Sequence, residues 1–138
     1  MMIDQADLLD GMDFLFVQKY MALTAMQNYA KGDFIIREGD KADYFFILIE
    51  GSVRVSVGGG EKEVYVVSHP GEAFGWSSLL DRNYYSASAE CLEPTRLHKM
   101  ERTKLDQLLQ AHPEAGAIFY KRIAGMLGHR LVESYKLI

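Results

Sequence analysis

Residues 44–57 read YFFILIEGSVRVSV, and the pattern of this stretch decides the fold class. The first half is apolar almost without interruption up to Gly51, which is typical of a buried β-strand. In the second half, Val53, Val55 and Val57 alternate with polar residues. Such alternation is typical of a strand with one face in a hydrophobic core. The stretch therefore predicts two successive β-strands.

The flanking sequence extends this strand pattern. Segment 58–62 (GGGEK) predicts a flexible turn, and segment 63–67 (EVYVV) predicts the hairpin partner of the strand before it. Segments 86–93 and 95–100 predict two further strands. Several short strands joined by glycine-rich turns indicate a β-sandwich or a small barrel.

Helical periodicity appears on both sides of the β region. Segment 13–29 predicts a helix with Asp13 as its N-cap, because its apolar residues recur at helical spacing: Phe16, Tyr20, Leu23 and Met26. Segment 102–112 predicts a second helix. Pro113 then suits the first position of a third helix, because proline lacks the N–H that would be unsatisfied there.

The third helix carries an apolar stripe to the end of the sequence, formed by Phe119, Ile123, Met126, Leu127, Leu131, Tyr135 and Ile138. Gly116, Gly125 and Gly128 weaken this helix, since each glycine costs about 1 kcal/mol relative to alanine. The helix therefore needs a packing partner, which is either the barrel or a second copy of the chain. The length of the stripe favours a homodimer through this helix.

Composition limits the classes of protein that the sequence fits. The chain has 138 residues, of which 49% are hydrophobic and 25% charged, as expected for one globular domain. No apolar run approaches the length of about 18 residues needed to span a bilayer, and the acidic N-terminus does not resemble a signal peptide. The single Cys91 suits a reducing compartment. We therefore expect a cytoplasmic protein without membrane association.

The net charge of −4 hides a basic C-terminal part, in which residues 94–138 carry 8 basic and 4 acidic side chains. A nucleic-acid-binding surface is one interpretation of this asymmetry. The basic residues are scattered among apolar positions of one helical pattern, however. The solvated face of a helix is therefore the favoured interpretation.

The sequence offers no support for catalytic or metal chemistry. The four histidines share no short spacing, and no nucleophile motif accompanies the single cysteine. The GGGEK turn lacks the Gly-Lys-Ser/Thr ending of a phosphate-binding loop and opens no helix. We expect neither an enzyme nor a metal site.

Residues 74–89 read FGWSSLLDRNYYSASA and look like a loop that holds a phosphate, yet Arg82 is the one basic residue in this stretch. Gly75 permits close approach of a ligand or of backbone, and residues 77–80 fit one helical turn. Two interpretations stay open from composition alone. The free N–H groups of the turn face an anion, or the segment is a crossover whose apolar side chains plug the barrel, namely Phe74, Leu79 and Leu80.

Nearly the whole chain resembles the cyclic-nucleotide-binding domain of catabolite-activator-type regulators and kinase regulatory subunits. The resemblance rests on Gly32-Asp33, Glu38-Gly39-Asp40, Asp43, Phe46, Ile47, Gly51, Val53, Gly71-Glu72 and Phe74-Gly75. It implies a mainly β fold, a double-stranded β-helix (jelly roll), flanked by helices. The implied parts are an N-terminal helical segment over 1–30, the jelly roll over 31–100, and two closing helices over 101–138.

The ligand cassette departs from the family pattern at two positions. In the family, Phe-Gly is followed by a glutamate that accepts a hydrogen bond from the ribose, and this position is Trp76 here. A Pro-Arg pair, whose arginine pairs with the cyclic phosphate, is replaced by Tyr84-Tyr85, and Ser86 follows. Tryptophan donates but cannot accept as a carboxylate does, and tyrosine brings no permanent positive charge.

Two substitutes for the lost contacts are conceivable. In the first, Arg82 swings into the pocket and replaces the lost arginine, although pairing with Asp81 at the surface is the simpler arrangement. In the second, Trp76 and Tyr85 form an aromatic wall for a different effector, and serine hydroxyls act as donors. The predicted ligand-binding residues are Phe74, Gly75, Trp76, Ser77, Ser78, Leu79, Arg82, Tyr85, Ser86 and Ala87. The alternative is that the aromatic side chains fill the pocket and that no ligand binds.

The resemblance thus implies a non-enzymatic regulatory module with a divergent cassette. A cyclic nucleotide or another small effector is the candidate ligand, and no cofactor is certain. The C-terminal helix is the expected route of signalling to a regulated protein partner. Because the sequence ends at Ile138, before the position of a helix-turn-helix in DNA-binding members, we expect no direct DNA binding. The alternative function is a structural or protein-interaction module with a filled pocket.

Overall fold

Eight strands in two four-stranded antiparallel sheets form the centre of the molecule, and the computed structural model describes residues 8–137. The strands are β1 (Ala25–Tyr29), β2 (Phe34–Ile36), β3 (Tyr44–Glu50), β4 (Val53–Val57), β5 (Lys62–Val67), β6 (Ala73–Phe74), β7 (Ser88–Cys91) and β8 (Thr95–Glu101). The helical elements are α2 (Phe14–Leu23), the 3-10 helix η1 (Trp76–Leu79), α3 (Arg102–Ala111), α4 (Pro113–Ser134) and the 3-10 helix η2 (Tyr135–Leu137).

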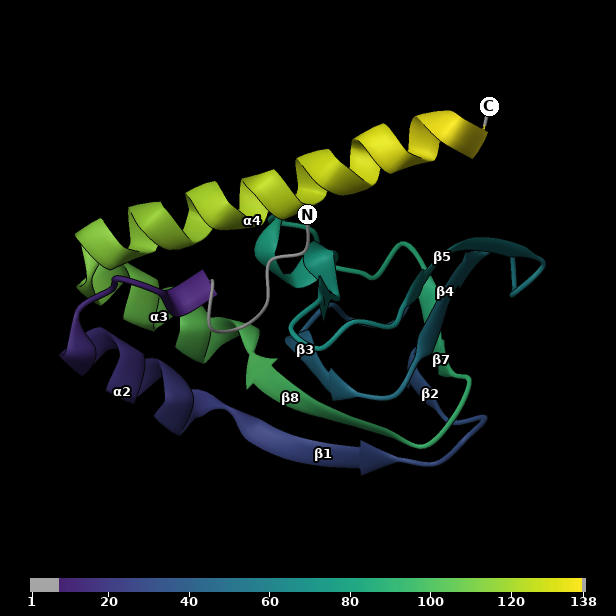
Figure 1. The fold of residues 1–138 in the computed structure, drawn as a ribbon, viewed down its shortest axis with the longest axis horizontal. Helices are drawn as coiled ribbons and strands as arrows, with labels where there is room; N and C mark the ends of the chain where they lie inside the picture. The colour runs from purple at the N-terminus through teal and green to yellow at the C-terminus, as the bar shows by residue number, and fades with distance from the viewer. Residues whose placement is uncertain (1–7, 138) are drawn as a thin grey trace.

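The strand orders are β1-β8-β3-β6 in one sheet and β2-β7-β4-β5 in the other. The chain therefore crosses repeatedly between sheets, as in a jelly roll. In Figure 1, α2 and α3 lie together at one end of the sheets, and α4 extends from there toward the end where β4 and β5 lie. The predicted mainly β fold with one N-terminal and two C-terminal helices is confirmed. No helix among residues 8–137 is long and apolar enough to cross a bilayer.

Strand β3 separates two hydrophobic cores, which explains the uninterrupted apolar run in its sequence. Phe45 and Ile47 face the core that the helices share, and Phe46 and Leu48 face the core inside the two sheets. All four side chains are at most 3% exposed. Because successive side chains of a strand point to opposite faces, a strand covered on both faces needs apolar residues at every position.

The N-terminal helix is shorter than the predicted helix over 13–29. Asp13 caps it as expected, and its carboxylate accepts a hydrogen bond from the Phe16 N–H. The helix ends at Leu23, because Thr24 is extended and its hydroxyl donates to the Met21 carbonyl. The prediction was wrong for residues 25–29, which form β1 and pair with β8. Met26, taken as part of the helical stripe, is an exposed strand residue.

Helix α4 begins at Pro113 as predicted. The predicted apolar stripe is divided between two environments. Phe119 and Ile123 are buried in the core under the helices, and Met126 and Leu127 pack against its edge. Leu131 and Tyr135 are exposed, and Ile138 lies outside the described residues. The first half of the stripe is thus the contact of α4 with its own domain and is not free to form a dimer interface.

Tyr85 is a structural cross-link between the loop after η1 and the start of β3. Its side chain is 7% exposed and belongs to the core inside the sheets. Its hydroxyl donates to the Tyr44 carbonyl at 2.6 Å and accepts from the Tyr44 N–H at 3.0 Å. Burial raises the pKa of Tyr85 to about 12. The loop is therefore fastened to the barrel by one side chain.

Gly51 occupies the turn between β3 and β4 in a conformation that other residues avoid. Its φ is +114°, and an added Cβ would lie 2.5 Å from the Thr95 Oγ1 and 2.7 Å from the Thr95 Cα. We expect Gly51→Ala to lower the free energy of unfolding by about 3 kcal/mol, because strain and steric overlap add. Gly59→Ala is the matched control, since Gly59 also has positive φ but nothing within 4 Å. Urea denaturation measures both, and equal losses would contradict the prediction.

Tyr85 also predicts an alkaline weakening of the fold. The folded protein keeps a proton to about pH 12 that the unfolded chain releases near pH 10.0, so this contribution is complete below pH 10 and is lost as pH rises through 12. The stability advantage of the wild type over Tyr85→Phe should shrink by about 2 kcal/mol between about pH 9 and pH 12 in urea denaturation. Tyr84→Phe, at an exposed neighbour, is the control. An advantage that stays constant with pH would exclude the raised pKa.

Candidate functional site

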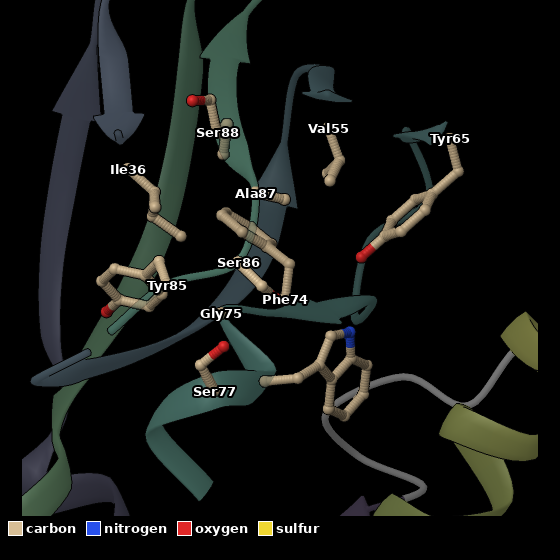
Figure 2. Close-up of a pocket in the computed structure, with 12 residues that line it drawn as sticks. Ile36, Val55, Tyr65, Phe74, Gly75, Ser77, Tyr85, Ser86, Ala87 and Ser88 are labelled. Atoms are coloured by element: carbon tan, nitrogen blue, oxygen red, sulfur yellow. The ribbon is translucent and has the colours of Figure 1, made fainter. Parts of the chain in front are cut away.

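A pocket of about 70 Å³ opens at one end of the sheet formed by β2, β7, β4 and β5, beside the β6–η1 segment. It lies where the divergent cassette runs. Figure 2 shows Ile36 and Tyr85 on one side of the pocket and Tyr65 on the other, with Ser86 between them. The residues that line it are Ile36, Val55, Tyr65, Phe74, Gly75, Trp76, Ser77, Tyr85, Ser86, Ala87, Ser88 and Ala89.

The structure brings together most, but not all, of the residues predicted to bind a ligand. Those at the pocket are Phe74, Gly75, Trp76, Ser77, Tyr85, Ser86 and Ala87. Ser78 and Leu79 instead line a separate hollow near Arg102 and Tyr120. The predicted set is therefore divided by η1, one part on each side.

Arg82 does not reach the pocket. Its side chain is exposed, and its backbone carbonyl accepts a hydrogen bond from the Arg102 Nη1 at 2.7 Å. The expected surface partner of Arg82, Asp81, lies instead 3.9 Å from the Arg102 Nη2. The loop is thus held by its backbone to Arg102, and Arg82 is not among the residues that line the pocket.

The sequence prediction missed Ile36, Val55 and Tyr65, which come from distant strands, and also Ser88 and Ala89 at the end of the loop over 74–89. Val55 carried a signal, because it is an inward position of an alternating strand. Tyr65 lies in the hairpin strand β5, which pairs with β4. The sequence placed both strands correctly, but not their position opposite the cassette.

Gly75 and η1 set the shape of the cassette. Gly75 has a φ of +80°, and an added Cβ would lie 2.9 Å from the Phe46 ring. The predicted helical turn is present as η1, in which the Ser78 hydroxyl donates to the Gly75 carbonyl at 2.9 Å. Gly75 is therefore required for packing against Phe46. The proposal that the turn faces an anion stays a prediction.

Tyr85, which the sequence resemblance aligns with the phosphate-binding arginine of the family, is directed away from the pocket centre (Figure 2). Figure 2 shows its ring as a wall and its hydroxyl pointing outward. That hydroxyl is already paired with the backbone of Tyr44. The side chain offers the pocket an apolar face and no donor.

Trp76, which the sequence resemblance aligns with the ribose-binding glutamate of the family, packs against the helical core. Its ring lies 6.1 Å from that of Phe45. Within residues 8–137, its buried indole Nε1 has no acceptor at hydrogen-bond distance and angle. The Tyr65 hydroxyl is close enough for the indole N–H to oppose the upward shift that burial gives the pKa of Tyr65. Trp76 therefore lines the pocket with an indole N–H that has no hydrogen-bond partner among the described residues.

The pocket lining carries no charged side chain. Ser88 is already used as a structural acceptor, since its hydroxyl accepts from the Glu38 N–H at 2.9 Å. Ser77 is buried and Ser86 is exposed at the rim. Burying an anionic group without a paired cation costs several kcal/mol. The arrangement suits neutral polar and aromatic groups better than a phosphate.

Metal chemistry has no support in the described part of the chain. Across residues 8–137, no group of three or more histidine, cysteine, aspartate or glutamate side chains lies close enough to hold an ion. Cys91 is buried as a free thiol, and burial raises its pKa. Cys91 is therefore buried in the way expected of a structural residue.

Comparison with known proteins places this geometry in a family. The sequence profile of the cyclic nucleotide-binding domain matches residues 26–112, more than half of the chain. A cyclic AMP receptor protein of Thermus thermophilus is 31% identical over 118 residues, or 83% of this chain and 53% of that protein. A cAMP-dependent protein kinase regulatory subunit of Dictyostelium discoideum is 31% identical over 107 residues, or 69% of this chain and 33% of that protein. The chain spans about a third to a half of these relatives.

A solved structure supports the same assignment. A cyclic nucleotide-binding domain from Methylobacillus flagellatus superimposes with a TM-score of 0.81 and 26% identity, covering 94% of this chain and 75% of that one. The profile match includes all eight strands except the first residue of β1, and it continues through α3. The solved structure also covers 94% of this chain, and its superposition agrees with the jelly-roll fold flanked by helices. The chain belongs to the cyclic nucleotide-binding domain family.

Proposed function

We propose that this domain is a non-enzymatic regulatory sensor whose pocket accepts an uncharged small effector in preference to a cyclic nucleotide. The observation that carries this proposal is the pocket lining, in which no residue bears a charge. A cyclic nucleotide carries one negative charge, and a charge-assisted hydrogen bond is about twice as strong as a neutral one. Without a guanidinium at position 85, the pocket lacks that contact.

Aromatic surfaces and a few hydroxyls define what such an effector would contact. Tyr65 lies on one side of the pocket and the Tyr85 ring on the other, and Trp76 also lines it (Figure 2). Among residues 8–137 the Trp76 indole N–H has no hydrogen-bond acceptor, and Ser86 offers an exposed hydroxyl. A flat ring system with an acceptor group satisfies both requirements. The pocket of about 70 Å³ is below the 300–1,000 Å³ typical of ligand sites, so it must open for binding.

A filled pocket is the second candidate, and the hydrogen bonding of Tyr85 favours it. The side chain closes one wall and is fixed to Tyr44 by two hydrogen bonds. In this case the domain acts as a structural or protein-interaction module. The two candidates differ in one property, which is whether the pocket opens for any small molecule.

We further propose that the effector acts through α4, toward a protein partner or a second copy of the chain. The solvent face of α4 carries a stripe at spacings of three and four residues that continues to Tyr135 of η2, and we call it the outer stripe: Ala117, Tyr120, Ala124, Gly128, Leu131 and Tyr135. Small residues in such a stripe allow two helices to approach closely, and the larger ones supply apolar contact.

The free thiol of Cys91 fits a reducing, cytoplasmic setting.

Thermal melts test the sensor function with two matched probes. Adenosine and cyclic AMP share a base and a sugar, but only cyclic AMP carries a charge. We expect adenosine at a high concentration to raise the melting temperature more than cyclic AMP does, because a ligand at a hundredfold excess over its dissociation constant stabilises by about 2.7 kcal/mol. A larger shift with cyclic AMP would contradict the uncharged-ligand proposal. No shift with these probes or with a wider panel of neutral metabolites would favour the filled pocket.

The double variant Trp76→Glu with Tyr85→Arg is the converse control in the same assay. Restoring the carboxylate and the guanidinium should create a shift with cyclic AMP, with a gain in affinity of about tenfold or more. The neutral pair Trp76→Gln with Tyr85→Leu disturbs the same positions and should show no gain. If the charged pair folds and gains nothing, the pocket differs from the family at more than these two positions.

Sedimentation velocity tests the dimer. We expect the wild-type domain to sediment as a dimer, and Leu131→Glu to shift it toward monomer, because a charge in the outer stripe must be desolvated in the interface. Lys121→Glu changes an exposed α4 residue outside the stripe and should leave the dimer intact. A wild-type monomer at all accessible concentrations would exclude the proposal.

A further inference from the structure

The last two turns of α4 have a different connection to the domain from the rest of the helix. The fully buried side chains of α4 end at Ile123, and the partly buried contacts with the core end at Leu127. Beyond this point Leu131 and Val132 are more than half exposed. Arg130 is the described residue of this part that pairs with the barrel. It therefore holds the end of the helix where apolar packing no longer does.

Arg130 pairs with the carboxylate of Glu72, which backbone N–H groups of the barrel hold in place. Glu72 lies in the turn before β6 and is 6% exposed. Its Oε1 accepts from the backbone N–H groups of Ser68 at 3.1 Å and of His69 at 2.9 Å, and lies 3.2 Å from the His69 Nδ1. Its Oε2 accepts from the Arg130 Nη2. If Arg130 leaves, a nearly buried carboxylate oxygen loses its partner in the described structure.

The same guanidinium also lies on the outer wall of the pocket. The Arg130 Cζ is 4.0 Å from the centre of the Tyr65 ring, within the range of a cation–π contact. Tyr65 is one of the residues that line the pocket. Its hydroxyl is also near the Trp76 indole N–H. One aromatic ring thus touches the pocket and the end of α4 together.

We propose that Arg130 is a latch that couples the pocket wall to the last two turns of α4. Because the pocket holds only about 70 Å³, anything larger must displace a wall to enter it, and displacement of the Tyr65 ring breaks its contact with Arg130. The coupling rests on the proposed sensor function for its role in signalling. The contacts of Arg130 with Glu72 and Tyr65 do not require a ligand, because all three residues belong to the same chain.

The geometry sets the direction of the effect. Displacement of Tyr65 weakens its contact with Arg130, so an occupied pocket loosens residues 128–134 of α4. Coupling between two sites is reciprocal. A variant that releases Arg130 therefore makes the pocket wall easier to displace, although it touches no residue of the pocket lining other than Tyr65. The outer stripe of α4 passes through the same turns, so the latch also acts on the proposed dimer contact.

Hydrogen exchange of the ligand-free domain, followed by mass spectrometry, tests the latch. We expect Arg130→Gln to speed exchange of the amides in 128–134 by about tenfold, because a hydrogen bond to a charged group is lost. Tyr65→Leu, which removes the ring but keeps an apolar side chain, should speed the same amides. Lys121→Gln is the control on α4, and Ser86→Ala is the control at the pocket; both should match the wild type.

Two further readouts separate the parts of the proposal. Arg130→Lys retains the charge for Glu72 but loses the flat contact with Tyr65, so its exchange should fall between wild type and Arg130→Gln. Unchanged exchange in Arg130→Gln would show that the latch does not hold the helix, and unchanged exchange in Tyr65→Leu would show that the wall is not coupled to it. Neither result depends on a ligand. A failure of adenosine to bind would therefore contradict the sensor function while this measurement still decides the latch.

Discussion

The burial of β3 on both faces is the constraint on which the rest of the molecule depends. Its side chains alternate between a core shared with the helices and a core inside the sheets. Phe45 reaches Phe119 of α4, whose ring lies 6.5 Å away, and Phe46 stacks on Phe74 at 5.2 Å. The strand thus fixes the closing helices and the start of the cassette with adjacent residues. A shift of one residue in its register would exchange the two cores.

The backbone shape of the cassette is held by structural contacts, and the pocket beside it is lined without charged residues. Gly75 is needed because Phe46 occupies the space of a side chain there. Tyr85 is needed because it satisfies both polar groups of one residue of β3. These contacts preserve the loop whether or not a nucleotide binds. Similarity of the loop backbone is therefore evidence for the fold, and the ligand must be argued from the lining.

Local patterns made β3, β4, β5, β7, β8 and the start of α4 predictable, but not β1, β2 and β6. Valine alternation identified β4, and Pro113 marked the first turn of its helix. The helix predicted over 13–29 was too long, because Met26 continues the helical spacing by coincidence while Thr24 ends the helix through its hydroxyl. The family pattern led to Trp76 and Tyr85, but not to the opposite wall. Tyr65 and the Glu72–Arg130 pair join segments far apart in the sequence, and no periodicity encodes such a contact.

The double hydrogen bond of Tyr85 also bears on how such a pocket changes over evolution. An arginine at this position would lose both bonds to Tyr44, and its charge would lie in a site that is 7% exposed. A single change to arginine therefore lowers stability before any phosphate contact offsets the loss. Trp76, packed on Phe45, is part of the core in the same way. Because both aromatics support the fold, we expect sequences intermediate between this pocket and a nucleotide pocket to be less stable than either.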